Sequence, residues 1–222
     1  MIAIIQARTS SKRFPNKVVK KIGDITLLEQ VINQVNRAFK TKKIIVATSK
    51  NKSDIKICKI CKKKGIIYYR GDLKNVSKRY YDVLKKFRSK SFIRICADSP
   101  FINPILIKKC IKIFNKKKLD FLTNLLPRSF PKGQSIEIFK SKIYLTGFKN
   151  IINTSDKENV TTYFYKNKKQ YRYINIKNNL NLSKISMCID FPKDLIKANK
   201  AVNKLRDYKK INSWKNYLKF FK

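Results

Sequence analysis

Basic and hydroxyl side chains gather in one short segment near the start of the sequence, residues 7–17, which reads A-R-T-S-S-K-R-F-P-N-K. Backbone amides and hydroxyl groups can surround phosphate oxygens, while Arg8, Arg13 and Lys17 neutralise their charge. The segment contains no glycine, so it matches neither the P-loop pattern nor the dinucleotide-binding fingerprint. These residues predict a polyphosphate-binding loop, and a solvated basic loop is the alternative.

Asp98 and Asp190 each follow an apolar run, in C-A-D-S-P and C-I-D-F-P, in a chain with only 13 acidic residues. If both runs are strands of one sheet, the two carboxylates meet at the edge where open parallel sheets bind ligands. Two carboxylates facing a phosphate loop are what a nucleotide-bound Mg²⁺ requires. The alternative for each aspartate is a helix N-cap ahead of the following proline and helix.

The overall composition excludes several classes of active site and of binding partner. The 222 residues include no histidine, which excludes Ser-His-Asp triads, histidine metal sites and imidazole bases. The formal net charge is +41, from 54 basic and 13 acidic residues. The lysines are spread along the whole chain rather than concentrated on one helix or arm, which favours a bias in residue usage over a nucleic-acid-reading surface. We therefore expect no specific nucleic-acid partner, and a basic nucleic-acid-binding domain is the non-enzyme alternative.

Cysteine usage and hydropathy indicate a soluble, cytoplasmic protein. Five cysteines are an odd number and do not suggest a secreted disulfide framework. Cys58 and Cys61 form a C-x-x-C pair that lacks further metal ligands, and their spacing suits packing on one face of a helix. The apolar start of the chain is too short for a signal peptide, and no stretch approaches the ~20 apolar residues of a membrane span.

Hydrophobic periodicity predicts alternating strands and helices in the first half of the chain. This order is typical of an α/β fold, with a mostly parallel sheet covered by helices on both faces. The predicted strands are 1–6, 43–48, 66–69, 92–96 and 121–124, and the predicted helices are 26–37, 51–64, 77–87 and 104–115.

The second half is less regular, and we expect one domain over residues 1–222 with a small subregion near residues 125–180. An aromatic cluster within it could stack on nucleic-acid bases, but we expect core or a homodimer surface. The C-terminal apolar stripe is expected to dock onto the parent domain. The predicted strands are 135–139, 171–176 and 185–189, the predicted helices are 141–152, 158–165 and 192–204, the aromatic cluster is Tyr163, Phe164, Tyr165, Tyr171 and Tyr173, and the stripe is Trp214, Tyr217, Leu218 and Phe221.

The loop 7–17 resembles the A-R-x-x-S-x-R-x-P-x-K signature of sugar cytidylyltransferases. These include the 3-deoxy-manno-octulosonate and acylneuraminate CMP-transferases and especially the spore-coat-polysaccharide branch. Six further segments match in the same order along nearly the whole chain. They are V-A-T-S at 46–49, G-D with V-S-K-R-Y-Y at 71–81, R-I-C-A-D-S-P at 94–100, P-K-G-Q-S-I-E-I-F at 131–139, E-N-V-T at 158–161 and C-I-D-F-P-K-D-L at 188–195.

The resemblance implies a single Rossmann-like nucleotidyltransferase domain that uses CTP and Mg²⁺. The anomeric hydroxyl of a nonulosonate-like acidic sugar would attack the α-phosphate of CTP, giving a CMP-sugar and pyrophosphate for surface polysaccharide or glycoconjugate assembly. Such chemistry depends on cations and metal rather than on an imidazole base, so the missing histidine is no obstacle. A nucleotidyltransferase acting on a sugar or polyol phosphate is the enzymatic alternative.

The resemblance also implies roles for individual residues. Arg8, Lys17 and Asp98 would be catalytic, and Asp98 and Asp190 would bind the metal. The sequence differs from the family pattern at Ser10 and Ala97, where glycine is frequent, at Ser135, where aspartate is common, and at Asn159, where histidine is usual. The implied nucleotide-binding residues are Ala7, Arg8, Ser10, Ser11, Arg13, Lys17, Ala47, Thr48, Ser49 and Arg79, and those facing the sugar are Lys132, Gly133, Glu137 and Asn159.

Overall fold

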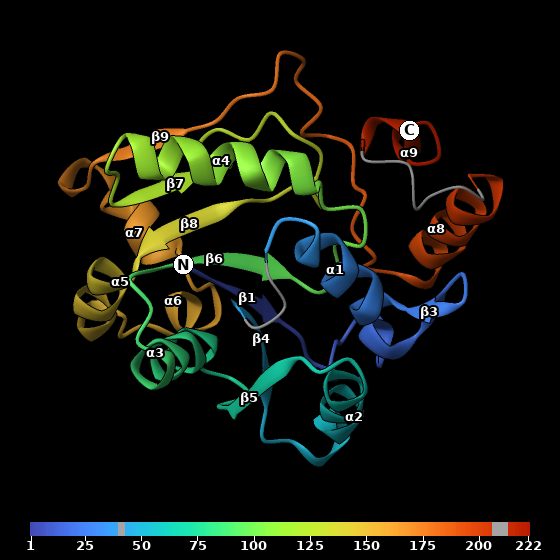
Figure 1. The fold of residues 1–222 in the computed structure, drawn as a ribbon, viewed down its shortest axis with the longest axis horizontal. Coiled ribbons are helices and arrows are strands. Elements are labelled where there is room, and N and C mark those ends of the chain that lie inside the picture. The colour runs from blue at the N-terminus through green and yellow to red at the C-terminus, as the bar shows by residue number, and fades with distance from the viewer. Residues whose placement is uncertain (40–42, 206–212) are drawn as a thin grey trace.

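A seven-stranded, mostly parallel sheet runs through the centre of the protein (Figure 1). The computed structural model describes residues 1–39, 43–205 and 213–222. Within them the strand order across the sheet is β5-β4-β1-β6-β8-β7-β9. The strands are β1 (Ile2–Gln6), β4 (Ile44–Ser49), β5 (Ile67–Gly71), β6 (Ser91–Cys96), β7 (Phe121–Thr123), β8 (Glu137–Lys140) and β9 (Tyr173–Asn175).

Alternate residues of the central strands pack against helices on opposite faces of the sheet, because successive side chains of a strand point to opposite sides. Ala3 and Ile5 of β1 face a core formed with α1 (Leu27–Asn36), α2 (Ile55–Lys63) and α4 (Pro104–Lys116). Ile4 faces the other core, formed with α3 (Val76–Phe87), α5 (Ser141–Gly147) and α7 (Thr162–Lys166). The predicted α/β fold with helices on both faces is confirmed.

Strand β8 runs antiparallel to both of its neighbours, β6 and β7. Its first residue, Glu137, therefore lies opposite Arg94 of β6 and Thr123 of β7. Because β1, β4, β5 and β6 are mutually parallel, their carboxyl ends share one edge of the sheet, and the antiparallel strand brings its start toward that edge. This reversal places the carboxylate of Glu137 near the edge of the sheet at which the parallel strands end.

The subregion near residues 125–180 departs from the prediction in two places. The helix expected over 158–165 is confirmed only from Thr162, where α7 begins; α6 (Thr154–Glu158) ends at the expected start, and a turn at 159–161 lies between them. The helix expected over 141–152 ends early, as α5 stops at Gly147 and a 3₁₀ turn (Phe148–Asn150) follows. A Cβ on Gly147 would come within 2.6 Å of the Phe164 ring, so α5 and α7 pack very closely here.

The strand expected over 185–189 is wrong. The segment makes one isolated parallel bridge, between Lys132 and Ser186, and joins no sheet within the described residues. Its backbone nevertheless hydrogen-bonds to Lys132 on one side, and Ile189 N–H donates to the carbonyl of Asp98 at 2.9 Å. A two-stranded hairpin of β2 (Lys21–Ile22) and β3 (Ile25–Thr26), which was not predicted, turns at Gly23 with φ +59°.

The aromatic cluster and the C-terminal apolar stripe both pack inward. Phe164 of the aromatic cluster is fully buried in the second core, with the four tyrosines partly buried around it, so the expectation of a core role is confirmed. Trp214, Tyr217 and Phe221, in and around α9 (Lys215–Leu218), pack with Phe101 and Phe130, as expected. The remaining helix, α8 (Pro192–Lys204), begins two residues after Asp190.

Cys58 and Cys61 are free thiols buried on the inner face of α2, and burial raises the pKa of Cys61 to about 12. Both observations agree with a packing role. Among the described residues no cluster of three or more His, Cys, Asp and Glu side chains could hold a metal ion. No described helix is both long and apolar enough to cross a bilayer.

Candidate active site

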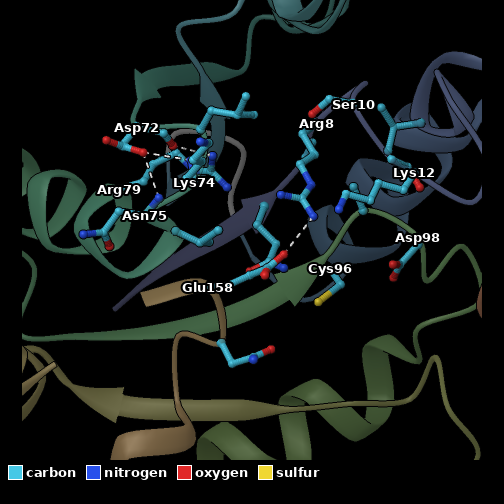
Figure 2. A pocket seen from close by; sticks show the side chains of 18 of the residues that line it. Arg8, Ser10, Lys12, Asp72, Lys74, Asn75, Arg79, Cys96, Asp98 and Glu158 are labelled. Atoms are coloured by element: carbon cyan, nitrogen blue, oxygen red, sulfur yellow. Dashed lines mark hydrogen bonds and ion pairs between the residues drawn. The ribbon is translucent and has the colours of Figure 1, made fainter. Parts of the chain in front are cut away.

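A cavity of about 1150 Å³ opens at the carboxyl ends of β1 and β6, beside the segment that follows β5 (Figure 2). Its walls come from five separate parts of the chain. Eight basic and four acidic side chains line it, so the cavity as a whole favours anions. The charged lining residues are Arg8, Lys12, Arg13, Lys17, Lys74, Arg79, Arg94 and Lys157, with Asp72, Asp98, Glu158 and Asp190.

A fully buried carboxylate, that of Asp54, fixes the start of the basic loop. Thr9 donates to it from its backbone N–H (2.7 Å) and from its hydroxyl (2.6 Å). Ser49, at the end of β4, also donates to it from both its N–H and its hydroxyl. Burial alone would raise the pKa of Asp54, but these hydrogen bonds outweigh it and hold the pKa below its ordinary value. With Thr9 anchored inward, Arg8, Ser10 and Ser11 are left to line the cavity.

Lys17 joins the two predicted metal-binding aspartates. Its ammonium lies 3.2 Å from an oxygen of Asp98 and 2.9 Å from an oxygen of Asp190, and Arg13 pairs with Asp190 at 2.8 Å. Desolvation would lower the pKa of Lys17, but the two carboxylates overcome it and raise the pKa. The cluster exists because the extended segment 185–189 is hydrogen-bonded beside Asp98. Residues far apart in the sequence therefore meet as predicted.

The Asp98–Asp190 pair fits a divalent cation. Both carboxylates already converge on one positive charge, that of Lys17, and both side chains remain about a quarter exposed (28% and 26%). Carboxylate oxygens are ligands that Mg²⁺ prefers, and Mg²⁺ commonly takes only one or two of them together with phosphate oxygens and water. A two-carboxylate site facing a phosphate loop has that composition.

The connection between β5 and α3 forms another wall of the cavity. Arg79, only 2% exposed, donates from Nη1 to the carbonyl of Asp72 at 2.9 Å, while its buried Nε has no partner among the described residues. Burial lowers the pKa of this guanidinium. Asp72, Lys74 and Asn75 line the same wall, and the sequence analysis assigned no role to these three.

The structure does not bring all predicted nucleotide-binding residues to the cavity. Ala7, Arg8, Ser10, Ser11, Arg13, Lys17 and Arg79 line it, whereas Ala47, Thr48 and Ser49 do not. These three residues of β4 are completely buried, and the hydroxyl of Ser49 donates a hydrogen bond to Asp54. Ser49 supports Thr9 through Asp54, and the carbonyl of Ala47 accepts from the N–H of Ala7 at the start of the loop. These side chains therefore offer no surface to the cavity, and their place near a nucleoside stays a prediction.

Of the four residues predicted to face a sugar, only Asn159 lines the cavity. Its neighbour Glu158 pairs with Arg8 at 3.2 Å across the opening (Figure 2). Lys132 and Gly133 form a turn against the segment 185–189. With φ +95° and the Met187 carbonyl carbon 3.1 Å from a Cβ placed there, position 133 suits only glycine. The P-K-G pattern therefore reflects the packing that places Asp190.

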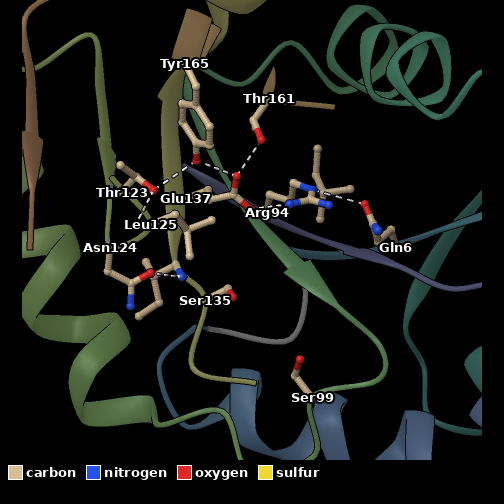
Figure 3. A network of polar contacts seen from close by, with 12 residues as sticks. Gln6, Arg94, Ser99, Thr123, Asn124, Leu125, Ser135, Glu137, Thr161 and Tyr165 are labelled. Atoms are coloured by element: carbon tan, nitrogen blue, oxygen red, sulfur yellow. Dashed lines mark hydrogen bonds and ion pairs between the residues drawn. The ribbon is translucent and has the colours of Figure 1, made fainter. Parts of the chain in front are cut away.

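Glu137, the fourth, is only 1% exposed and does not line the cavity. Figure 3 shows its carboxylate at the centre of a polar network. It accepts hydrogen bonds from the hydroxyls of Thr161 and Tyr165, each at 2.6 Å, and forms an ion pair with Arg94. Arg94 and Gln6, which the sequence analysis missed, line the cavity in its place. An arginine inside the otherwise apolar strand F-I-R-I-C was the signal that could have revealed them.

Comparisons with known sequences agree with this geometry. The sequence model of the cytidylyltransferase family matches residues 2–217. The chain is 33% identical over 196 residues to the uncharacterized protein MJ1063 of Methanocaldococcus jannaschii, covering 87% of this chain and 79% of that protein. It is 32% identical over 116 residues to the spore coat polysaccharide biosynthesis protein SpsF of Bacillus subtilis (50% of this chain, 48% of that protein). It is 30% identical over 126 residues to the 3-deoxy-manno-octulosonate cytidylyltransferase of Rickettsia canadensis (54% and 50%), so the last two matches span about half of those proteins.

Solved structures show the same arrangement of elements. A cytidylyltransferase from Leptospira borgpetersenii superposes with a TM-score of 0.87 at 25% identity, over 92% of this chain and 87% of that chain. A CMP:2-keto-3-deoxy-manno-octonic acid synthetase solved with CTP gives a TM-score of 0.66 at 15% identity, over 91% and 98% of the two chains. The second likeness shows the fold alone.

Proposed function

The chain belongs to the cytidylyltransferase family, and from this premise we propose that it transfers CMP from CTP to an acidic sugar in a Mg²⁺-dependent reaction that releases pyrophosphate. The fold is that of Rossmann-like nucleotidyltransferases, and the chain is a CTP-dependent enzyme of that class. The observation that carries the proposal is the convergence of Lys17, Asp98 and Asp190 beside the basic loop.

In the proposed reaction the anomeric hydroxyl of the sugar attacks the α-phosphorus of CTP. A new phosphorus–oxygen bond forms, the bond from the α-phosphorus to the oxygen that bridges to the β-phosphate breaks, and the proton of the attacking hydroxyl passes to solvent. Negative charge then grows on the leaving pyrophosphate, so fixed cations at the cavity lower the barrier. Arg8, Arg13 and Lys17 supply these cations, and the hydroxyls of Ser10 and Ser11 can donate to phosphate oxygens. Their contribution is binding and orientation, and none of these side chains is required to act as a base.

Asp98 and Asp190 are the residues that would hold Mg²⁺. When bound, the ion supplies positive charge to the triphosphate and favours ionisation of a hydroxyl that it contacts. In the structure, Lys17 and Arg13 balance the two carboxylates, and Glu158 balances Arg8. Each of the three cations Arg8, Arg13 and Lys17 is thus paired with a carboxylate.

The nature of the acceptor rests on the relatives. The spore coat protein acts in polysaccharide biosynthesis by its name, and the Rickettsia enzyme takes 3-deoxy-manno-octulosonate, an acidic sugar. An acidic sugar destined for a surface polysaccharide or glycoconjugate is the acceptor that fits both. A sugar or polyol phosphate is the alternative acceptor, because the cavity has an excess of basic side chains.

Thermal unfolding with CTP, UTP, ATP and GTP at saturating Mg²⁺ tests the nucleotide. All four carry the same triphosphate, so general attraction to a chain of charge +41 cancels in the comparison. A ligand at 100 times its dissociation constant stabilises by about 2.7 kcal/mol, which amounts to a few degrees. We expect a shift for CTP well above the other three, after which sugar acids can be screened for pyrophosphate release. Equal shifts would contradict a cytidine site.

A further inference from the structure

Arg94 lies at the floor of the cavity with two of its three nitrogens engaged by the protein (Figure 3). Its Nη1 pairs with Glu137, and its Nε donates to Oε1 of Gln6 at 3.1 Å. Its side chain is 15% exposed, and the Glu137 ion pair raises its pKa despite the opposing effect of burial. Within the described part of the chain, Nη2 has no hydrogen-bond partner and is not sealed from solvent.

Gln6 presents a second donor beside it. Its Oε1 accepts from Arg94 and from the hydroxyl of Tyr80 (3.3 Å), which fixes the orientation of the amide. The Nε2 of Gln6 has no partner among the described residues and is open as well. The cavity floor therefore offers Nη2 of Arg94 and Nε2 of Gln6, two groups that can only donate. Such a pair is complementary to a group that only accepts, and an oxyanion is the strongest acceptor.

The carboxylate that holds Arg94 is not one of those that hold the cations of the loop 7–17. Glu137 holds Arg94 with one oxygen, and with the other it holds Thr161, two residues after the cavity-lining Asn159. Arg94 and the turn at 159–161 are thus fixed by one buried carboxylate. The phosphate-binding cations instead lie on the loop 7–17 and pair with Asp98, Asp190 and Glu158.

We propose that Arg94 and Gln6 bind an oxyanion of the acceptor, and that Glu137 is the positioning residue that holds Arg94 in place. This proposal rests on the proposed function and refines its acceptor. A carboxylate of a sugar acid and the phosphate of a sugar or polyol phosphate share the required chemistry. An arginine fixed at Nε and Nη1 has lost its freedom before binding, so the remaining donor meets the ligand at little further entropic cost.

The test uses the full chain saturated with a non-reactive CTP analogue that has a methylene bridge between the α- and β-phosphorus atoms. Three probes are titrated: 3-deoxy-manno-octulosonate, the same sugar with its carboxyl reduced to an alcohol, and glycerol 3-phosphate. NMR signals of the Gln6 side-chain amide and of Arg94 Nε–H report binding directly. We expect both signals to move with one charged probe and not with the alcohol. The probe that moves them identifies a carboxylate or a phosphate, and no movement with either overturns the proposal.

Arg94→Lys keeps a cation opposite the buried Glu137, which would otherwise be left unpaired at a large cost in stability. It should weaken binding of the responding probe at least about tenfold, while affinity for the CTP analogue changes less than twofold. Gln6→Met leaves the ion pair intact and should act in the same direction, so the proposal stays testable if Arg94→Lys fails to fold. An equal loss of affinity for the CTP analogue would place Arg94 in the triphosphate site and overturn the proposal.

Glu137→Gln keeps the shape of the side chain and removes its charge. We expect weaker probe binding with unchanged affinity for the CTP analogue. Partial recovery of probe binding in the double variant Arg94→Gln/Glu137→Gln, which lacks the guanidinium, would show that Glu137 has only a structural role and would contradict its role in positioning Arg94. Arg172→Lys, an exposed arginine outside the cavity, is the matched control and should bind every ligand as the natural chain does. If the chain binds CTP no better than UTP, the proposed function itself is contradicted. If it prefers CTP but the NMR signals of Arg94 and Gln6 do not move with either charged probe, only this inference is contradicted.

Discussion

Among single residues, Lys17, Asp98 and Asp190 converge at the cavity; we predict that Asp98 is a catalytic metal ligand, and Asp98→Asn tests this prediction. The substitution keeps the size of the side chain but removes a charge that a metal ion requires, so we expect pyrophosphate release to fall at least about 100-fold in kcat/KM. Asp82→Asn is the matched control, because Asp82 pairs with Lys78 on α3 and does not line the cavity. Full turnover in Asp98→Asn would refute the assignment of Asp98 as a metal ligand.

The hydrogen bonds to Asp54 lead to a second prediction, which concerns how the free energy of unfolding depends on pH. Its pKa in the folded protein is lower than the ordinary 3.8, so the folded state favours the ionised form. This contribution to the free energy of unfolding is fully present above about pH 4 and is lost as the pH falls through the folded pKa. Asp54→Asn should cost about 1–3 kcal/mol at pH 7 and less at lower pH, because four hydrogen bonds from Thr9 and Ser49 lose their charged acceptor. Urea unfolding at pH 7 and pH 3 measures it, and an equal cost at both would contradict the ionised state.

On the scale of elements, the turn at Gly133 decides where Asp190 lies. Gly133→Ala places a methyl group against the Met187 backbone in a conformation of φ +95°. We expect a loss of about 1–3 kcal/mol in stability, together with reduced pyrophosphate release, because the segment carrying Asp190 must shift. Gly65→Ala is the control: its φ is also positive (+63°), but a Cβ there meets no atom within 4 Å. Equal effects of both substitutions on activity would show that strain alone, and not the contact with 187, is responsible.

The elements also show what the sequence could predict. Buried strands such as β1 and β4 are continuous apolar runs, and α4 begins at an Asn103 cap followed by Pro104, so local patterns sufficed. The segment 185–189 has the same apolar composition as a strand, yet its neighbours are Lys132 and the carbonyl of Asp98, contacts that only the folded chain contains. Glu137 was assigned to the ligand because its motif matched. Its burial follows from the reversal of β8, which no local pattern specifies.

For the whole molecule, the cavity and the net charge act at different ranges. A ligand in the cavity would contact the lining residues directly, whereas a charge of +41 attracts any polyanion through solvent. Salt screens the second effect, since the Debye length falls from about 10 Å at 0.1 M to about 3 Å at 1 M. Contacts that distinguish cytosine from uracil are short and involve no net charge difference, so salt should leave them nearly unchanged.

We therefore predict that raising KCl from 0.05 to 0.5 M weakens the binding of CTP and of UTP by about tenfold each, while the ratio of their dissociation constants changes less than twofold. Isothermal titration at both salt concentrations measures the two quantities together. A ratio that collapses toward one at high salt would mean that the apparent preference for CTP came from the long-range field. A preserved ratio would locate the preference in the cavity, where Arg79 and the wall from Asp72 to Asn75 can contact a nucleoside directly.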